Sequence, residues 1–240
     1  MESIFQKNSE FQELEKQWYS ALNNNSVDYS VYDHELYFCD VWACWLIYSR
    51  KYLLSINSNK SMATKDDHGN WYNMKSIVDF MGNIKSVADL GCSFGYTTAG
   101  LKEIFSNAEV YGTNFKDTIQ FQVASEISRE YNFKLVGDIK ELPKIDLVFA
   151  SEYFEHIHDP VNHLSDIIQL LQPRYFLIAN SFGADAIGHF NVYQYNNKPI
   201  HSSKIGRIFN DFLRYKGYWK VPTKLWNNRP QFWMTHHGTN

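Results

Sequence analysis

The hydrophobic and polar positions change their period near residue 83, and this change divides the chain into two parts. Over residues 1–82 apolar side chains recur at helical spacing, whereas from residue 83 short apolar runs alternate with amphipathic stretches. We therefore expect a helical N-terminal cap over residues 1–82 and an α/β domain over residues 83–240.

Two helices are expected near the N-terminus. Apolar side chains recur at helical spacing over residues 11–22, and the polar run 23–26 ends the pattern. A second helix is expected to begin near Asp33, which can cap it, and to continue to Tyr52. Because its apolar residues lie nearly all round the helix, we predict that this second helix is buried.

A polar segment over residues 55–70 separates these helices from a third. It holds too many helix- and strand-breaking residues for either periodicity, and we interpret it as a linker, with a mobile lid over a site as the alternative. Apolar residues at helical spacing over 71–81 then predict a short amphipathic helix that ends at Gly82. No strand is expected before residue 83.

Strands and helices alternate in the second part of the chain. Five short apolar runs predict strands at residues 87–90, 109–114, 133–138, 145–151 and 175–180. Helices are expected between them, and one is marked by Asp159 as a cap with Pro160 at the first helical position. After an irregular segment at 182–200, a helix that begins at Ser202 precedes two more strand-like runs, at 218–221 and 231–235.

Repeated strand–helix units of this length predict a parallel sheet with right-handed crossovers. The fold class is therefore α/β: a Rossmann-like, mostly parallel sheet of seven strands with helices on both faces, plus the helical N-terminal cap. In such sheets ligands bind beyond the carboxyl ends of the strands. The candidate functional residues are accordingly those that follow each strand.

Composition argues against several classes of function. The 240 residues carry a formal net charge of -3, which gives no electrostatic reason to bind a nucleic-acid polymer. No apolar run approaches the roughly 18 residues that a membrane-spanning helix needs, and no leader pattern opens the chain. The three cysteines form no C-x-x-C pair, as expected of reduced thiols. We expect a cytoplasmic protein with a small-molecule substrate and no membrane partner; the oligomeric state is left open.

The most informative stretch is D-L-G-C-S-F-G, residues 89–95. It predicts the end of a strand, a glycine-rich turn and the start of a helix, where a ligand can approach the backbone and free N–H groups favour carboxylate or phosphate. The same letters satisfy G-x-S-x-G, the nucleophile elbow of α/β-hydrolases, with Ser93 as the nucleophile of a serine esterase. The other members of such a triad would come from Asp138, Asp146, His189 and His236.

From residue 85 onward the chain resembles class I S-adenosylmethionine-dependent methyltransferases. D-L-G-C-S-F-G resembles the family's first motif, in which an acidic residue precedes the turn that holds the methionyl part and ribose of the cofactor. The second strand ends in G-T-N at the ribose-contacting position, and G-D-I at 137–139 looks like the adenine-contacting site. The stretch A-S-E-Y-F-E-H-I-H-D-P, residues 150–160, is similar to the family's stretch ending in Glu-His and Asp-Pro. The resemblance implies S-adenosylmethionine as cofactor, S-adenosylhomocysteine as product, and cofactor-binding roles for Asp89, Gly91, Cys92, Ser93, Gly95, Asn114, Asp138, Ile139 and Ser151.

Two residues depart from the family pattern. Ser93 stands where the turn usually has a glycine, and Asn114 stands where the second strand usually ends in Asp or Glu. An amide can bond a ribose hydroxyl, but it is a weaker acceptor than a carboxylate. A non-catalytic binding module that has kept the fold is therefore an alternative, beside the serine esterase.

The candidate catalytic residues are two histidines. Methyl transfer is an in-line displacement, so the protein chiefly aligns donor and acceptor and excludes water. A hydroxyl acceptor must also lose a proton, which suits a histidine near neutral pH. His156 follows the fourth strand, and His189 lies in the irregular segment that should face the acceptor. For His156 a structural or positioning role is the alternative.

A metal site is not expected, although metal-binding residue types cluster after the fourth strand. His156 and His158 project together only if their segment is extended, whereas His163 lies inside a predicted helix. Spacing of this kind does not favour a shared ligand set. The remaining members of the cluster are Glu155 and Asp159.

The acceptor is inferred from what would surround the transferred methyl group. These segments are the N-terminal helices, residues 182–200 and W-N-N-R-P at 226–230. Aromatic residues, which make up 17% of the chain, suit planar or sugar rings, and the polar residues can bond hydroxyls or an anion. The alternative is that these segments are core and a turn. We expect a sugar, nucleotide sugar or natural-product intermediate methylated on oxygen; nitrogen methylation is not distinguished by the sequence.

Overall fold

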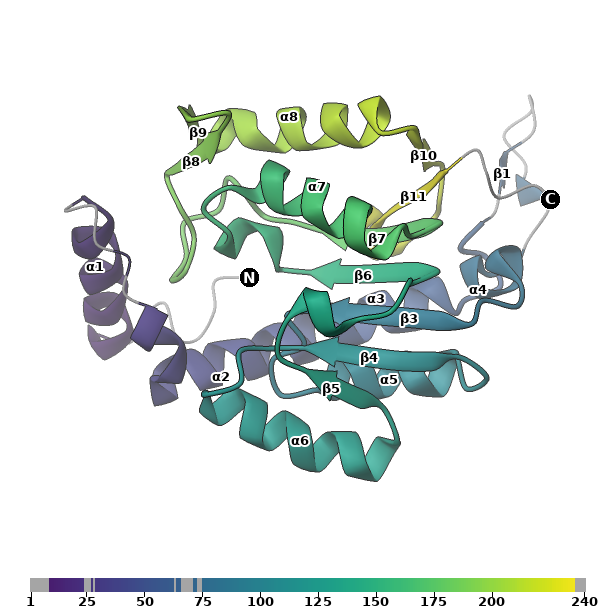
Figure 1. Ribbon diagram of the computed structural model, residues 1–240, viewed down its shortest axis with the longest axis horizontal. Coiled ribbons are helices and arrows are strands. Elements are labelled where there is room, and N and C mark those ends of the chain that lie inside the picture. Colours follow the sequence, from purple (N-terminus) through teal and green to yellow (C-terminus); the bar gives the residue numbers. More distant parts are fainter. Residues whose placement is uncertain are drawn as a thin grey trace.

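The computed structural model describes residues 9–23, 27, 29–62, 64–65, 71–72 and 75–235, and its centre is a seven-stranded sheet (Figure 1). The strands follow one another across the sheet in the order β10-β11-β7-β6-β3-β4-β5. Their bounds are β3 (Ser86–Leu90), β4 (Glu109–Thr113), β5 (Lys134–Val136), β6 (Leu147–Ser151), β7 (Tyr175–Ala179), β10 (Tyr218–Val221) and β11 (Gln231–Thr235). All neighbours are parallel except that β11 runs antiparallel to both β7 and β10. Strand order reverses at β3, which pairs with β4 on one side and β6 on the other, so the ligand crevice is expected there.

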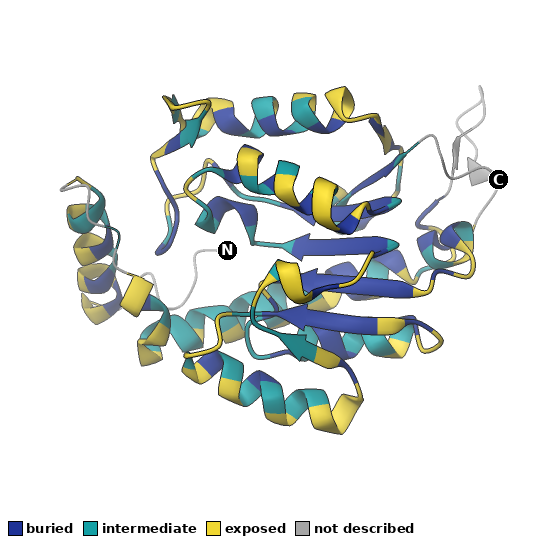
Figure 2. Cartoon of the chain, viewed as in Figure 1, coloured by how far each residue is buried: buried dark blue, intermediate teal, exposed yellow. Residues whose placement is uncertain are grey.

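Helices cover both faces of the sheet. One hydrophobic cluster joins the sheet to α1 (Ser9–Asn23), α7 (Pro160–Leu171) and α8 (Ser202–Tyr215). The other joins it to α3 (Arg50–Ile56), α4 (Ile77–Met81), α5 (Tyr96–Ile104) and part of α6 (Ile119–Tyr131). Successive strand residues enter opposite clusters, as Val87 and Ala88 do, because side chains alternate across a strand. The central strands are accordingly buried while the outer helix faces are exposed (Figure 2).

The predicted α/β pattern is confirmed. Each of the seven expected strands is present, with ends that differ by at most a few residues from those predicted. Helix α7 begins as expected, with Pro160 in its first turn and Asp159 accepting the Asn162 N–H at 3.2 Å. No helix in the described ranges combines the length and apolarity that a membrane crossing requires.

The prediction of an irregular segment at 182–200 is wrong for its second half. Strands β8 (Val192–Tyr195) and β9 (Lys198–His201) form an antiparallel hairpin. Asn196 and Asn197 join them with φ of 50° and 58°, the left-handed pair that a tight hairpin turn requires. Helix α8 begins at Ser202 as predicted, and its cap is His201, the last residue of the hairpin, whose side chain accepts the Ser203 N–H.

The second N-terminal helix differs from its prediction in two ways. Helix α2 (Glu35–Cys44), a π-helical turn η3 (Trp45–Ser49) and α3 follow without a break, and α2 is capped by His34 rather than Asp33. No residue of α2 is buried, and Trp42 is 41% exposed. Burial was wrongly predicted for α2, because an apolar circumference buries a helix only where other elements surround it, whereas Tyr52 in α3 is buried as predicted.

Residues 57–81 also differ from the prediction. Short strands β1 (Thr64–Lys65) and β2 (Trp71–Tyr72) pair where no strand was expected. Helix α4 begins later than predicted, because Ser76 and Asp79 form a capping box at its start, and it ends at Gly82 as predicted. Residues 63 and 66–70, part of the segment interpreted as a linker or lid, lie outside the described residues.

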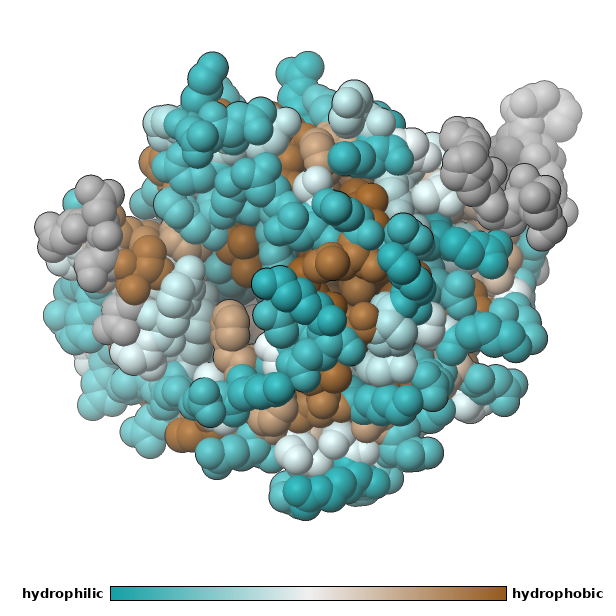
Figure 3. Space-filling view, viewed as in Figure 1, coloured by the Kyte–Doolittle hydropathy of each residue, from teal (hydrophilic) through white to brown (hydrophobic). Residues whose placement is uncertain are grey.

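The N-terminal region crosses the carboxyl edge of the sheet, so that its ends pack on opposite faces (Figure 1). Helix α1 meets the 182–190 segment through Trp18, whose Nε1 donates to the His189 carbonyl at 2.7 Å. The 3-10 turn η2 (Tyr29–Asp33) meets α6, where Gln120 Nε2 donates to the Tyr32 carbonyl at 2.9 Å. On this view the rim of the molecule is mostly hydrophilic, with hydrophobic side chains gathered toward the middle (Figure 3). The division into residues 1–82 and 83–240 stays a prediction.

Candidate active site

The glycine-rich turn after β3 is a tightly coiled piece of backbone. Gly91, Ser93 and Gly95 have φ of 68°, 49° and 88°, a left-handed conformation that glycine adopts with least strain. A Cβ added at Gly91 would lie 2.5 Å from Cδ2 of Tyr153. A side chain at that position is therefore excluded, and a ligand meets exposed backbone there.

Cys92, a buried residue of this turn, connects the turn to β4. Its side chain is buried, and a Cβ added at Gly112 of β4 would lie 2.9 Å from its Sγ. The Cys92 N–H donates to the Thr113 carbonyl at 2.8 Å. Burial raises the pKa of the Cys92 thiol well above its usual value. Cys92 thus anchors the turn to β4 and offers a ligand neither its thiol nor its N–H.

The two departures from the family pattern hold the turn in place. Ser93 Oγ donates to Gln120 Oε1 at 2.9 Å, and Asn114 Nδ2 donates to the Ser93 carbonyl at 3.0 Å. Asn114 Oδ1 accepts the Phe115 N–H at 2.9 Å. An aspartate at position 114 could not donate to that carbonyl, because an ionised carboxylate is acceptor-only. Asn114 therefore fastens the turn to the end of β4, and any ribose contact would use the second lone pair of its oxygen.

Asp89 connects β3 to the helix that follows the turn. It is 2% exposed, and its Oδ2 accepts from Thr98 Oγ1 at 2.7 Å. Burial raises the pKa of Asp89 to about 7, partly offset by the Thr98 hydrogen bond. Asp89 can thus act on a ligand by fixing the turn and the start of α5.

Polar groups also follow β5 and β6. Asp138 is exposed and caps the 3-10 turn η4 (Ile139–Glu141), where its Oδ1 accepts the Lys140 N–H at 2.9 Å. Ile139 is half-buried against the cluster under α7. Ser151 Oγ, at the end of β6, is buried and has no hydrogen-bond partner in the described part of the chain. A ligand at this edge would supply the partner that Ser151 lacks.

Together these groups fit S-adenosylmethionine. The Gly91–Gly95 backbone suits the methionyl part and ribose, the exposed Asp138 carboxylate can accept from an exocyclic amine, and the orphaned Ser151 hydroxyl lies beside β3. All of them follow parallel strands and so lie along one edge of the sheet. The structure brings the predicted cofactor residues together. The side chains of Cys92 and Asp89 are buried, so these two residues support the turn rather than line its surface.

The two candidate histidines lie against each other. The rings of His156 and His189 cross at 77° with centroids 4.8 Å apart. His189 is buried, and its Nδ1 is 2.8 Å from the Ala184 carbonyl oxygen. Because a carbonyl can only accept, Nδ1 carries the proton and Nε2 presents a lone pair. Burial lowers the pKa of His189, so the ring is neutral at pH 7.

His156 is held on more than one side. Its Nδ1 lies 3.2 Å from the Tyr32 hydroxyl, and its ring is also hydrogen-bonded to the Gly188 backbone. Burial, followed by the neighbouring His189, lowers the pKa of His156 to about 3. These contacts favour the positioning role over proton transfer.

Sequence reasoning did not single out the acidic pair Glu152 and Glu155. Glu155 Oε1 accepts the Ser181 N–H at 2.6 Å, and its buried Oε2 has no hydrogen-bond partner among the described residues. Burial, and then Glu152, raise the pKa of Glu155 well above its usual value. Glu152 has φ of 50° and lies 3.9 Å from the guanidinium of Arg229. Only the E-x-x-E spacing after a strand hinted at this pair, because its burial depends on segments distant in sequence.

The metal-type cluster after β6 is dispersed in the fold. Glu155 bonds a backbone amide, His156 bonds Tyr32, and His163 Nε2 lies 2.7 Å from the Tyr153 hydroxyl. Among the described residues no three His, Cys, Asp or Glu side chains form a group that could hold a metal ion.

The nucleophile elbow is not assembled in the described structure. Ser93 Oγ bonds Gln120 rather than a histidine. Asp146 lies at the other end of the sheet, where its Oδ2 accepts the Lys85 N–H at 2.6 Å at the start of β3. His236 lies outside the described residues. The geometry therefore gives no support to the serine-esterase alternative.

Comparison with known proteins adds sequence evidence to this geometry. A family model described as a methyltransferase domain matches residues 83–220, more than half of the chain. Malonyl-[acyl-carrier protein] O-methyltransferase 1 of Coxiella burnetii is 28% identical over 131 residues, which cover 52% of this chain and 40% of that protein. The chain thus matches less than half the length of this curated relative.

Two solved structures share the fold over nearly the whole chain. N,N-8-amino-8-demethyl-D-riboflavin dimethyltransferase (RosA) from Streptomyces davawensis is 12% identical with a TM-score of 0.58, covering 96% of this chain and 70% of its own. The mitomycin 7-O-methyltransferase MmcR is 12% identical with a TM-score of 0.56, covering 96% and 68%. At such low identity the likeness shows the fold alone. Combined with the matched domain and with the glycine-rich turn at the point where strand order reverses, it shows that the chain belongs to the class I S-adenosylmethionine-dependent methyltransferase family.

Proposed function

We propose that the protein transfers the methyl group of S-adenosylmethionine to a hydroxyl of a small polar acceptor, such as a sugar, nucleotide sugar or natural-product intermediate. The observation that carries the proposal is the neutral imidazole of His189, whose protonated Nδ1 is tied to the Ala184 carbonyl and whose Nε2 can accept a proton. The Coxiella burnetii relative is named an O-methyltransferase, which supports an oxygen rather than a nitrogen acceptor.

Each residue then has a defined part in the reaction. When bound, S-adenosylmethionine supplies a methyl group on a positively charged sulfur. The turn around Gly91 and the Ser151 hydroxyl orient the ligand at the ends of β3 and β6. His189 Nε2 accepts the acceptor's hydroxyl proton, and the charge that the ring gains strengthens its Nδ1–H bond to Ala184.

His156 positions this base. Its ring packs edge-on against His189, and the Tyr32 hydroxyl and the Gly188 backbone fix its orientation. A base held in this way loses little freedom when the acceptor binds, which favours the reaction.

The N-terminal region supports a closed acceptor site. Trp18 bonds the His189 carbonyl, and Tyr32 packs against His156, so two elements of this region lie over the histidine pair. Excluding water in this way favours transfer to the acceptor. Tyr193, in contrast, is buried and donates to the Glu155 carbonyl at 3.0 Å, so it belongs to the core rather than to an acceptor platform.

The test separates cofactor binding from turnover. We would measure S-adenosylhomocysteine affinity by calorimetry and methyl transfer to a panel of hydroxyl acceptors by mass spectrometry. His189→Ala should lower kcat by about 10²- to 10⁴-fold, the usual contribution of a general base, and leave the affinity nearly unchanged. Because burial lowers the pKa of His189 from 6.5, the activity of the unaltered protein should fall only below about pH 6.5.

The matched control is His158→Ala, since His158 is an exposed histidine of the same region. It should leave both measurements unchanged. A kcat for His189→Ala equal to that of the unaltered protein would rule out His189 as the base. Cofactor binding without transfer to any acceptor would favour the non-catalytic module, and no binding at all would refute the proposed function.

A further inference from the structure

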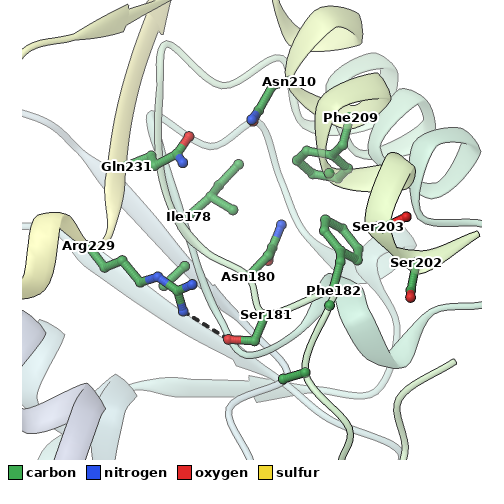
Figure 4. A pocket seen from close by; sticks show the side chains of 14 residues that line it. Ile178, Asn180, Ser181, Phe182, Ser202, Ser203, Phe209, Asn210, Arg229 and Gln231 are labelled. Atoms are coloured by element: carbon green, nitrogen blue, oxygen red, sulfur yellow. Dashed lines mark hydrogen bonds between the residues drawn. The ribbon is translucent and has the colours of Figure 1, made fainter. Parts of the chain in front are cut away.

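A hollow of about 470 Å³ lies beside the cofactor edge (Figure 4). It is bounded by the end of β7 with the turn that follows, by the first half of α8, and by the residues that lead into β11. The backbone joins it to the end of β6, because the Glu152 N–H donates to the Ala179 carbonyl at 2.7 Å. A ligand in the hollow would thus lie next to the strand that carries Ser151.

The lining combines apolar side chains with hydrogen-bonding groups and carries a single charge. Arg229 is the charged member of the set of lining residues, which contains no carboxylate. The side-chain amides of Asn180, Asn210 and Gln231 turn toward the same space (Figure 4). Asn180 Oδ1 is buried and has no hydrogen-bond partner in the described part of the chain. The hollow therefore has a positive end and an uncharged polar middle.

Arg229 is held in place rather than free to swing into solvent. Its guanidinium donates to Ser181 Oγ at 2.8 Å and is hydrogen-bonded to the Tyr52 hydroxyl from α3. The Glu152 carboxylate lies 3.9 Å away and forms an ion pair with the guanidinium, at a distance too long for a hydrogen bond. A guanidinium has five N–H donors, so further donors remain for a ligand. The side chain is 39% exposed, which leaves it accessible from the hollow.

We propose that this hollow is the acceptor subsite and that it selects acceptors bearing a carboxylate or a phosphate, which binds Arg229. Charge-assisted hydrogen bonds from a fixed guanidinium are the strong contacts for such groups. The three amides bond hydroxyl or carbonyl groups of the same molecule, and Phe182 provides an apolar wall. This inference rests on the proposed function, since it narrows the small polar acceptor to an anionic one.

Binding is tested on the full chain saturated with S-adenosylhomocysteine. Inorganic phosphate, benzoate and the neutral benzamide are titrated separately by calorimetry. We expect at least one of the two anions to bind and benzamide not to bind. Phosphate alone would identify a phosphate-bearing acceptor, and benzoate alone a carboxylate-bearing one.

The variant Arg229→Gln should weaken anion binding by at least about tenfold, because a charge-assisted contact is lost. Arg229→Lys keeps the charge without the planar fork and should restore part of the affinity. Arg207→Gln is the matched control: this arginine lies on α8 outside the hollow with its side chain 89% exposed, and its loss should change nothing. Thermal melts and S-adenosylhomocysteine binding check that each variant is folded.

Turnover gives a second readout with pairs of hydroxylated acids and their amides as acceptors. In Arg229→Gln the KM for the acid should rise by at least about tenfold, while the KM for the amide and both kcat values stay close to those of the unaltered protein.

Two results would overturn the subsite: equal anion affinity in Arg229→Gln and the unaltered protein, or no binding of either anion to the unaltered protein at tens of millimolar. Neither result touches the proposed function, which S-adenosylhomocysteine binding and methyl transfer test independently.

Discussion

Replacing Asp89 by asparagine should change how the stability of this protein depends on pH. Asp89 is 2% exposed within β3, and burial raises its pKa from 3.8 to about 7. Between these two values the folded protein keeps a proton that the unfolded chain has released. Stability must therefore fall as the pH rises through this window.

The magnitude follows from the size of the shift. One pKa unit corresponds to about 1.36 kcal/mol, so a shift of roughly three units costs on the order of 4 kcal/mol once the pH exceeds 7. The cost grows by about 1.4 kcal/mol for each pH unit between the two pKa values and is absent below the lower one. Asparagine has nearly the same shape, carries no titrating proton, and can still accept from Thr98. Asp89→Asn should therefore be the more stable protein at pH 8 and nearly equal to the unaltered protein near pH 4.

Urea unfolding of both proteins at intervals from about pH 4 to pH 8 measures the difference directly. Asp117→Asn is the matched control, because that carboxylate is exposed in a loop. The reasoning would be refuted if the unfolding free energies of Asp89→Asn and the unaltered protein stayed parallel over the whole range. Such a result would mean that the buried carboxyl is solvated as well as an exposed one.

Three glycine substitutions, one of them a control, test the cofactor turn and the wall of the hollow. Gly91→Ala should destabilise the fold by about 1–3 kcal/mol and weaken S-adenosylhomocysteine binding at least tenfold, because its Cβ would meet the Tyr153 ring at a positive φ. Gly217→Ala is the control, because Gly217 has φ of 85° with open space around it. It introduces the same backbone strain without a clash and should leave binding intact. Gly206→Ala lies inside α8, where its Cβ would be 3.4 Å from Phe182, and it should raise the unfolding free energy by about 0.5–1 kcal/mol. A lower unfolding midpoint for Gly206→Ala, or unchanged binding by Gly91→Ala, would contradict these assignments.

The sequence by itself determined the seven strands of the central sheet, most helices, and the sheet edge along which the candidate cofactor residues lie. Alternation along β3 sends Val87 and Ala88 to opposite faces, and the Asp159–Pro160 pair starts α7, because both effects act between neighbours in the chain. The order of strands and the turn after the first of them then place the cofactor residues along one edge.

Only the tertiary structure decided what the remaining groups do. Asn114 stands where the family usually has an acidic residue. Its side chain donates to the Ser93 carbonyl and so supports the turn. The helix that precedes η3 is half-exposed although its composition predicts burial, since burial depends on which elements cover it. The His189 carbonyl accepts from Trp18, 171 positions away in the sequence. Arg229 is held at the hollow by its hydrogen bond to Ser181. Periodicity and capping describe interactions within a few residues, whereas the protonation state of a buried group and the shape of a pocket depend on segments that meet when the chain has folded.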